Sequence, residues 1–323
     1  RMKVYFERGM ISKIVMDDLK MDVLAEWGYY TSFDGDSQDS GAYIFRPAMP
    51  DQELKILKPI SSSIKIIENK LVKEIHVSFG WIHQIVKIYR GKNYVDVEYT
   101  VDNIPIHDQI GKEIVHRLRS NIRSNSTFYT DSNGREFQKR QRSMRQSWDF
   151  IEFEPIAGNY YPVNTAIFIE DTGKASLTVL TDRSQGGSSL KNGSIELMVH
   201  RRTLKDDGRG VGEALNETES IHANEPYGDG SRIGDGLAIT GFHRIVIADG
   251  SGASAARAEM DAMFSPLLLF AGNSDRRVEN YSETEELPIH LLSDYILPDN
   301  VQLLTVKLLS TNSNGSSRLL IRL

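Results

Sequence analysis

Residues 62–101 alternate between apolar and polar side chains, and this alternation restricts the folds open to the chain more than any other feature. The apolar positions are Ile64, Ile66, Ile75, Val77, Phe79, Trp81, Val86, Ile88, Val95, Val97, Tyr99 and Val101. A spacing of two is typical of half-buried strands, whose successive side chains point to opposite faces. Turn-forming residues interrupt it at Glu68-Asn69, Phe79-Gly80 and residues 90–93. The pattern predicts an antiparallel meander of a β-sandwich rather than βαβ units.

Shorter patterns along the rest of the chain extend this prediction. We expect a hairpin around Arg8-Gly9, strands near residues 128–129, 166–169, 177–180 and 195–199, and a hairpin around Asn314-Gly315. One short helix is predicted over the alanine-rich residues 255–263, capped by Ser251 or Ser254 and stopped by Pro266. The chain begins and ends inside strand patterns, so we expect partner strands from sequence outside it.

The composition excludes several classes of protein. The 323 residues include no cysteine, so disulfide scaffolds, thiolate metal sites and cysteine nucleophiles are out. The 38 Lys and Arg against 44 Asp and Glu give a net charge of −6, so no nucleic-acid partner is expected, and the basic stretch from Arg135 to Arg145 is interpreted as a solvated strand face. No apolar run approaches the roughly 18–20 residues that cross a bilayer, so no membrane partner is expected either.

Familiar catalytic motifs are absent from the sequence. The eight histidines form no HxH or HExxH pair, so no zinc site is predicted within the chain, and neither GxSxG nor a P-loop occurs. Glycoside hydrolysis needs two carboxylates on opposite sides of one bond. Asp17-Asp18, Glu152 with Glu154, and Asp206-Asp207 are candidates, and the sequence does not decide which carboxylates face each other.

Two segments carry side chains suited to a hydroxylated ligand. Residues 40–47 place Tyr43 where a glycine turn meets a strand, and a phenol there can hydrogen-bond a hydroxyl while its ring packs on an apolar sugar face. Residues 200–210 place Arg209 after Asp206 and Asp207, and its guanidinium offers a fixed fork of donors to vicinal hydroxyls. A buried core tyrosine and a charged surface loop are the competing interpretations, and these residues alone leave them open.

Asparagine sequons hint at the compartment. The pattern Asn-x-Ser/Thr occurs five times and makes five candidate glycosylation sites, at Asn125, Asn192, Asn216, Asn280 and Asn314. Chance would yield about two or three in a chain this rich in Ser and Thr, so the excess favours a protein of the secretory pathway.

Five blocks of sequence resemble a known family. They are SGAYIFRP at residues 40–47, FYTDSNGR at 128–135, AGNYYPVN at 157–164, TDRSQGGSSL at 181–190 and HRRTLKDDGRGVG at 200–212. In order and approximate spacing they resemble the C-terminal half of the lysosomal-type class II α-mannosidases, glycoside hydrolase family 38. The flanks and the region from residue 216 to residue 323 match more loosely.

The resemblance implies a retaining exo-α-mannosidase whose zinc ion, aspartate nucleophile and carboxylic acid catalyst all belong to an N-terminal portion that is not in this sequence. It implies an antiparallel β-supersandwich of the galactose-mutarotase type over residues 1–264 and part of a smaller β-sandwich over residues 265–323. Tyr43 and Arg209 would then contact the substrate, and Asp206 and Asp207 would orient Arg209.

The resemblance also implies partners and a location. The expected partners are the N-terminal catalytic chain of the same precursor, because lysosomal members are commonly cleaved into chains that stay together, and a mannose-containing oligosaccharide of N-glycans. A homodimer of the assembled enzyme is compatible with it. The expected location is the lysosome or vacuole, reached through the secretory pathway. A free-standing carbohydrate-binding β-sandwich without an enzymatic partner is the alternative.

Overall fold

The structure is a computed structural model that describes residues 2–35, 38–218, 236–265, 298, 301, 303, 305–311 and 317–322. Residues 1–267 form one compact unit and residues 268–323 a second. The division into domains at residues 1–264 and 265–323 stays a prediction, because it concerns the identity of the second domain, of which the structure describes mainly one hairpin.

The first unit contains seventeen described strands, two 3-10 turns and one described α-helix. In chain order these elements are β1 (Met2–Glu7), β2 (Met10–Met16), β3 (Leu19–Thr31), β4 (Lys55–Ile56), η1 (Ser61–Ser63), β5 (Lys65–Glu68), β6 (Val72–Ser78), β7 (Ile82–Tyr89), β8 (Val95–Val101), β9 (Lys112–Ser120), β10 (Thr127–Ser132), β11 (Glu136–Gln141), η2 (Ala157–Asn159), β12 (Tyr161–Val163), β13 (Ala166–Asp171), β14 (Ala175–Thr181), β15 (Gln185–Ser188), β16 (Ser194–Arg202), β17 (Ile239–Ala248) and α1 (Gly252–Phe264). The second unit contributes β18 (Thr305–Thr311) and β19 (Ser317–Arg322).

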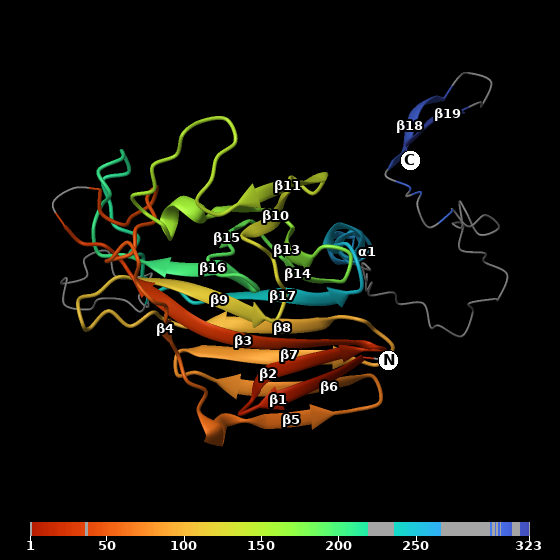
Figure 1. The fold of residues 1–323 in the computed structure, drawn as a ribbon, viewed down its shortest axis with the longest axis horizontal. Coiled ribbons are helices and arrows are strands. Elements are labelled where there is room, and N and C mark those ends of the chain that lie inside the picture. Colours follow the sequence, from red (N-terminus) through yellow and green to blue (C-terminus); the bar gives the residue numbers. More distant parts are fainter. Residues whose placement is uncertain are drawn as a thin grey trace, which may run out of the picture. The chain divides into compact units, whose positions relative to one another are not determined.

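The strands of the first unit form two antiparallel sheets (Figure 1). One has eight strands in the order β1-β2-β3-β9-β16-β15-β12, with β4 on β3, and the other has nine in the order β11-β10-β13-β14-β17-β8-β7-β6-β5. The predicted mainly β class with one short helix is therefore confirmed. The meander predicted over residues 62–101 is β5 to β8, in which each strand pairs with the next.

The predicted turns and helix follow the local chemistry. Between β1 and β2, Arg8 and Gly9 both have positive φ, of 50° and 83°, which a tight hairpin turn requires. Helix α1 begins after Ser251, whose hydroxyl accepts from the N–H of Ala253, so Ser251 is the cap and Ser254 lies inside the helix. The predicted C-terminal hairpin is β18–β19, while its proposed turn residues and Pro266 lie outside the described residues.

The main hydrophobic core lies between the two sheets, because its buried side chains come from both. Trp27 of β3 is fully buried and meets Tyr99 of β8 edge-on, with ring centroids 5.2 Å apart. Its indole N–H donates to Oε1 of Gln84 on β7 over 2.8 Å, which satisfies the only polar atom of the ring. A smaller core under α1 covers the opposite face of the nine-stranded sheet, with Val246 and Met260 among its members. None of the described helices is long and apolar enough to span a membrane.

A buried histidine pair joins the two sheets. Nδ1 of His116 on β9 lies 2.8 Å from Nδ1 of His243 on β17, and Trp27 stacks on His116 at 4.4 Å. Nε2 of His243 lies 2.8 Å from Oε1 of Gln185, which can only accept, so Nε2 carries a proton and Nδ1 of His243 accepts from His116. Nε2 of His116 is then unprotonated, and it has no partner among the described residues. This hydrogen-bonding pattern therefore requires both histidines to be neutral.

We predict that the free energy of unfolding falls as the pH is lowered from about 6.5 towards 3. Burial, aided by Arg183, lowers the pKa of His243 to about 3, and burial next to His243 lowers the pKa of His116. Below a pH of about 6.5, His116 and His243 therefore bind protons in the unfolded chain, where their pKa values lie near 6.5, but not in the folded protein. Within this window His243 lowers the free energy of unfolding by up to about 1.4 kcal/mol per pH unit, and His116 acts in the same direction.

Urea denaturation at about pH 6.5 and about pH 4.5 measures this loss. A double variant, His116→Gln with His243→Gln, should lose less stability between the two pH values than the parent protein. His83→Gln on β7, whose side chain is 48% exposed, is the matched control, and the difference between its slope and that of the double variant isolates the buried pair. An unchanged slope in the double variant would contradict the assignment.

Candidate functional site

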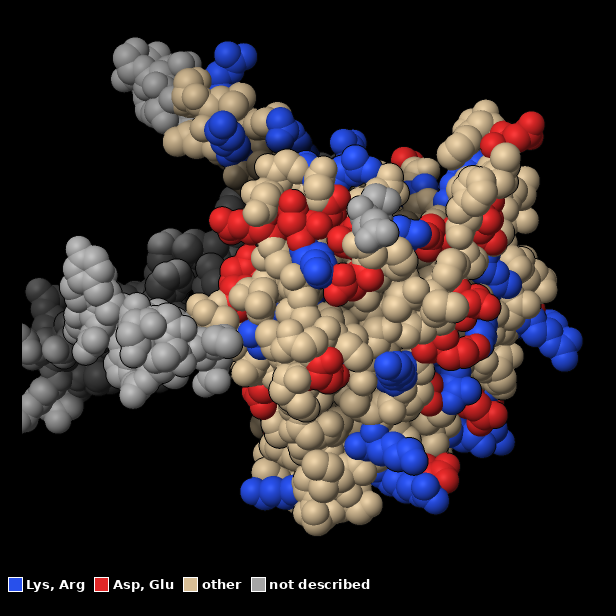
Figure 2. Space-filling model, turned by 90° about the vertical axis from the view of Figure 1, so that its left-hand side faces the viewer, with Lys and Arg blue, Asp and Glu red and all other residues tan. Residues whose placement is uncertain are grey.

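Both predicted site segments leave the same end of the eight-stranded sheet (Figure 1). Lys112, the first residue of β9, pairs with Thr31 at the end of β3 on one side and with Arg202 at the end of β16 on the other. The loops that follow β3 and β16 therefore start side by side. Figure 2 shows the corresponding side of the molecule, on which Lys and Arg side chains are mixed with Asp and Glu.

The loop after β3 folds back on itself and presents Tyr43. The N–H of Phe33 donates to the carbonyl of Arg46 over 2.8 Å, and the N–H of Gly41 donates to the carbonyl of Ile44 over 2.9 Å. These bonds close a tight loop around Tyr43, whose side chain is 67% exposed. The structure therefore does not support the competing interpretation of a buried core tyrosine.

Asp207 fastens this loop to the loop after β16. Its Oδ2 accepts from the N–H of Tyr43 over 2.6 Å and from the N–H of Ile44 over 3.0 Å, while its Oδ1 accepts from the N–H of Arg209 over 3.0 Å. Burial of the Asp207 carboxylate favours its protonated form, but these three N–H groups and the charge of Arg201 outweigh burial and lower its pKa. The carboxylate is therefore ionised and holds both loops by charge-assisted hydrogen bonds.

Gly41 allows the two loops to approach this closely. A Cβ placed on Gly41 would lie 2.8 Å from the main-chain N of Asp207 and 2.9 Å from its Cβ. Real Cβ atoms essentially never come this near to another heavy atom, so any larger residue would force the loops apart. The glycine of the SGAY block is thus explained by packing against Asp207 rather than by its backbone angles.

A buried carboxylate lies beneath the Tyr43 loop. Glu113 of β9 is completely buried and accepts from the hydroxyl of Ser40 over 2.5 Å and from Nε of Arg201 on β16. Nη2 of Arg201 also donates to the carbonyl of Ile44 over 2.7 Å. Removing one member of a buried ion pair costs about 3–5 kcal/mol, so this arrangement strongly favours one loop conformation. Glu113 was missed from sequence because it lies in no recognisable motif.

The structure joins three of the four predicted site residues by hydrogen bonds, and Asp206 is not one of these three. Tyr43, Asp207 and the main chain of Arg209 meet directly, whereas the exposed carboxylate of Asp206 has no partner among the described residues. Asp207 contacts the main chain of Arg209, and the exposed guanidinium has no hydrogen-bond partner among the described residues. The main chain of Arg209 is therefore held in place, while the N–H donors of its guanidinium are available to a ligand. That Asp206 and Asp207 orient the Arg209 side chain stays a prediction.

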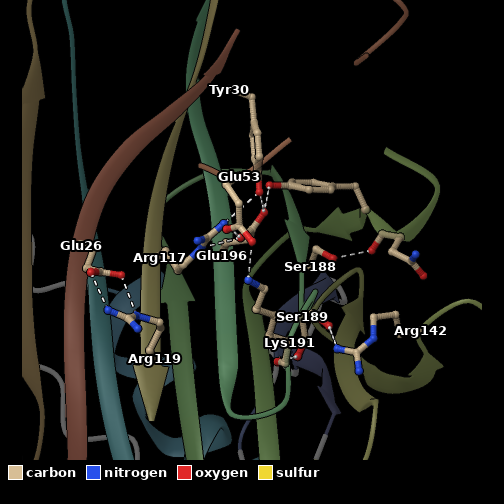
Figure 3. A network of polar contacts seen from close by, with 12 residues as sticks. Glu26, Tyr30, Glu53, Arg117, Arg119, Arg142, Ser188, Ser189, Lys191 and Glu196 are labelled. Carbon is tan, nitrogen blue, oxygen red and sulfur yellow. Dashed lines mark hydrogen bonds and ion pairs between the residues drawn. The ribbon is translucent and has the colours of Figure 1, made fainter. Parts of the chain in front are cut away.

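The eight-stranded sheet carries a second polar network on its outer face (Figure 3). Buried Glu196 of β16 accepts from the hydroxyls of Tyr30 over 3.0 Å and Tyr160 over 2.6 Å, and from Nε of Arg117 over 2.8 Å. Arg119 of β9 makes two 2.8 Å bonds to the carboxylate of Glu26. Burial, together with Glu196, raises the pKa of both tyrosines, so they remain neutral donors. The sheet beneath the site is therefore tied across β3, β9 and β16.

Comparison with known proteins identifies the family. Residues 1–209 match the family model described as the glycosyl hydrolases family 38 C-terminal domain. The chain belongs to glycoside hydrolase family 38. It corresponds to the C-terminal portion of the proteins of that family, as the sequence blocks predicted.

The relatives of this family 38 chain are named α-mannosidases. It is 41% identical to an alpha-mannosidase of Arabidopsis thaliana over 89% of its own length and 28% of that protein. It is 47% identical to the lysosomal alpha-mannosidase of Cavia porcellus, and 46% identical to that of Homo sapiens, over 66% of its own length and 21% of each relative. The chain thus spans between a fifth and three tenths of the length of these relatives.

A solved structure shares the fold of this family 38 chain. A glycosyl hydrolase family 38 protein from Enterococcus faecalis superposes with a TM-score of 0.54 at 11% identity, over 82% of this chain and 31% of that one. At this identity the likeness concerns the fold alone. It agrees with the antiparallel two-sheet architecture described above.

This family 38 chain carries candidate glycosylation sites but no cluster of metal ligands within its described residues. The described residues contain no group of three or more His, Asp or Glu side chains placed to hold a metal ion, so they do not fit the zinc ion that the family implies. Asn125 and Asn192 are exposed, although Oδ1 of Asn192 accepts from the N–H of Ser126 over 2.8 Å, and Oδ1 of Asn216 accepts from Nε of Arg202 over 2.6 Å. Asn280 and Asn314 lie outside the described residues. Use of any of these five sequons stays a prediction.

Replacing Asp207 by Asn should loosen the Tyr43 loop. One of the two carboxylate oxygens becomes an NH2 group, which then faces at least one main-chain donor and cannot accept from it. Hydrogen exchange at the amides of Tyr43 and Ile44, read by mass spectrometry of the full protein, should accelerate by at least about tenfold.

Asp206→Asn is the matched control for this experiment. The neighbouring carboxylate is exposed and accepts no main-chain hydrogen bond within the described residues, so its replacement should leave exchange in residues 40–46 unchanged. Equal exchange in the two variants would show that Asp207 does not hold the loop.

Proposed function

We propose that this chain is the non-catalytic C-terminal portion of a zinc-dependent, retaining exo-α-mannosidase. The zinc ion, the nucleophile and the acid catalyst would be held by the remaining portion of the same precursor, which in the relatives makes up most of the length. Membership of family 38 and the names of the relatives support the mannosidase activity. The role of this chain would be to complete the substrate pocket.

The observation that carries the proposal is the fastening of two loops by one carboxylate. Because Asp207 binds the main chain of both Tyr43 and Arg209, these residues lie on a common rim, which is formed by the loops that follow β3 and β16. The phenol can donate to and accept from sugar hydroxyls, and the guanidinium can donate to two vicinal hydroxyls at once. A rim set before substrate arrives lowers the entropic cost of placing the sugar against catalytic groups supplied from elsewhere.

The shape of the rim agrees with a pocket shared between two portions. A hollow of about 210 Å³ beside these loops is lined by residues that include Ser40 and Lys205 but neither Tyr43 nor Arg209. Within the described residues the two proposed contacts therefore form one wall rather than a closed cavity. A mannose ring held by these contacts needs its other walls from the catalytic portion.

The substrate and location follow from the relatives. Both compared mammalian proteins are named lysosomal alpha-mannosidases, and we propose the lysosome or vacuole as the location of this protein. The proposed substrate is an N-glycan oligosaccharide with terminal α-linked mannose, and the proposed partner is the N-terminal catalytic chain. A homodimer of the assembled enzyme is part of the same proposal, and exposed Asn125 and Asn192 are its proposed glycan sites.

Replacing Arg209 by Ala in the full-length enzyme should lower kcat/KM for an aryl α-mannoside by about 10–100-fold, because a hydrogen bond from a charged donor contributes about 1.5–3 kcal/mol. Tyr43→Phe, which removes one neutral donor, should lower it by about 3–10-fold. Steady-state kinetics at several substrate concentrations measure both effects.

Arg123→Ala is the control, because Arg123 is exposed and its side chain makes no hydrogen bond or ion pair within the described residues. Unchanged kinetics in Arg209→Ala would remove Arg209 from the substrate site. A purified protein that binds mannosides but hydrolyses none would overturn the enzyme proposal and favour a free-standing carbohydrate-binding module.

A further inference from the structure

A second surface of the first unit is incompletely covered. The edge strands β1 and β5 end the two sheets at the bottom of Figure 1 and border a groove of about 880 Å³. Among the described residues each of these strands pairs on one side only, β1 with β2 and β5 with β6. Their outer main-chain N–H and C=O groups are therefore available to another strand.

The floor of the groove is apolar. Met2, Val4 and Phe6 occupy alternate positions of β1 and are only half-buried, although the alternation directs them to the face that packs on the core. On the other side, Ile66 is 60% exposed and Leu71 is 75% exposed. Large apolar side chains in a continuous groove are unusual on a surface that faces only water, and they indicate a binding partner.

The rim of the groove is basic. It carries Lys3, Lys70, Lys73, Arg90 and Lys92 against one carboxylate, Glu68, which pairs with Lys73 over 3.1 Å. The chain as a whole has a net charge of −6, so this rim has the opposite sign to the rest of the molecule.

The groove is closed at one end by the β1–β2 turn. A Cβ on Gly9 would lie 2.9 Å from Cγ2 of Val77 and 3.2 Å from side-chain atoms of Ile64, so the turn touches the facing sheet there. The groove is therefore a channel along two strand edges rather than an open plane. This geometry suits an extended peptide, which can pair with an exposed edge and place alternate side chains on the floor.

We propose that this groove binds an extended segment of the same family 38 protein, from outside these 323 residues, in which apolar side chains alternate with Asp or Glu. The apolar side chains would cover Val4 and Ile66, and the carboxylates would face the lysines of the rim. The relatives contain more than twice as much polypeptide outside the matched region as within it, and a segment of the same protein binds at a high effective concentration.

Two other occupants fit the groove less well. A second copy related by a twofold axis would place one basic rim against another, which is repulsive. An anionic membrane would satisfy the charges but would leave the strand edges without main-chain partners. The inference rests on the proposed function only in that the chain works as part of a longer enzyme.

Site-specific photocrosslinking in the full-length enzyme tests the proposal. A p-benzoylphenylalanine at position 66 should crosslink to one acidic peptide of the same polypeptide precursor outside residues 1–323, as identified by mass spectrometry. The same probe at position 5 is the matched control, because Tyr5 lies on the outward face of β1 and does not line the groove. Absence of a crosslink at position 66, or a crosslink to a second copy of residues 1–323, would overturn the proposal.

Charge reversal supplies a second measurement. Lys70→Glu with Lys92→Glu should lower the crosslink yield at position 66 by at least about fivefold, whereas Lys174→Glu on the β13–β14 turn should not change it. Sedimentation with phosphatidylcholine vesicles, with and without phosphatidylserine, tests the membrane alternative, and binding that requires phosphatidylserine and Lys70 would overturn the peptide assignment. Because Arg209→Ala kinetics test the mannosidase proposal separately, the two failures are distinguishable.

Discussion

The packing of the two sheets against each other determines where everything else in the first unit lies. Trp27 of β3 contacts Tyr99 and Gln84 on the facing sheet, and it stacks on His116, which in turn bonds His243 across the core. A close-packed interior leaves no room for one strand to slide past another. The end of β3 and the end of β16 are therefore fixed on either side of Lys112, and the site loops start from fixed points.

The site loops themselves depend on buried charge rather than on apolar burial. Glu113 and Asp207 each accept several hydrogen bonds from different segments, and a buried carboxylate is tolerated only when its partners are in place. Any other conformation of the Tyr43 loop would leave Glu113 without Ser40 and Asp207 without two N–H donors. Fully satisfied polar networks of this kind specify one arrangement, because any displacement leaves a buried charge without its hydrogen-bond partners.

Sequence reasoning succeeded where local pattern decides the structure and stopped where distant residues meet. The alternation from Ile64 to Val101 predicted β5 to β8 because most inward side chains of this meander are apolar. Strand β9 was not predicted, because its buried positions include Glu113 and His116, which look like surface residues until their partners are known. Likewise, Asp207 was expected to orient Arg209, but its hydrogen bonds to the main chain of Tyr43, Ile44 and Arg209 are revealed by no residue pattern.

The two incomplete surfaces of the first unit differ in a way that bears on how the protein would assemble. The rim around Tyr43 and Arg209 is polar and held in place before any ligand arrives, whereas the β1–β5 groove is apolar, basic and open along two strand edges. A catalytic portion attached only at the rim could pivot about it, and small displacements of a contact residue are costly in catalysis. A second contact at the sheet edges would remove that freedom, so the groove and the rim can serve the same requirement of holding two portions of one enzyme in a fixed orientation.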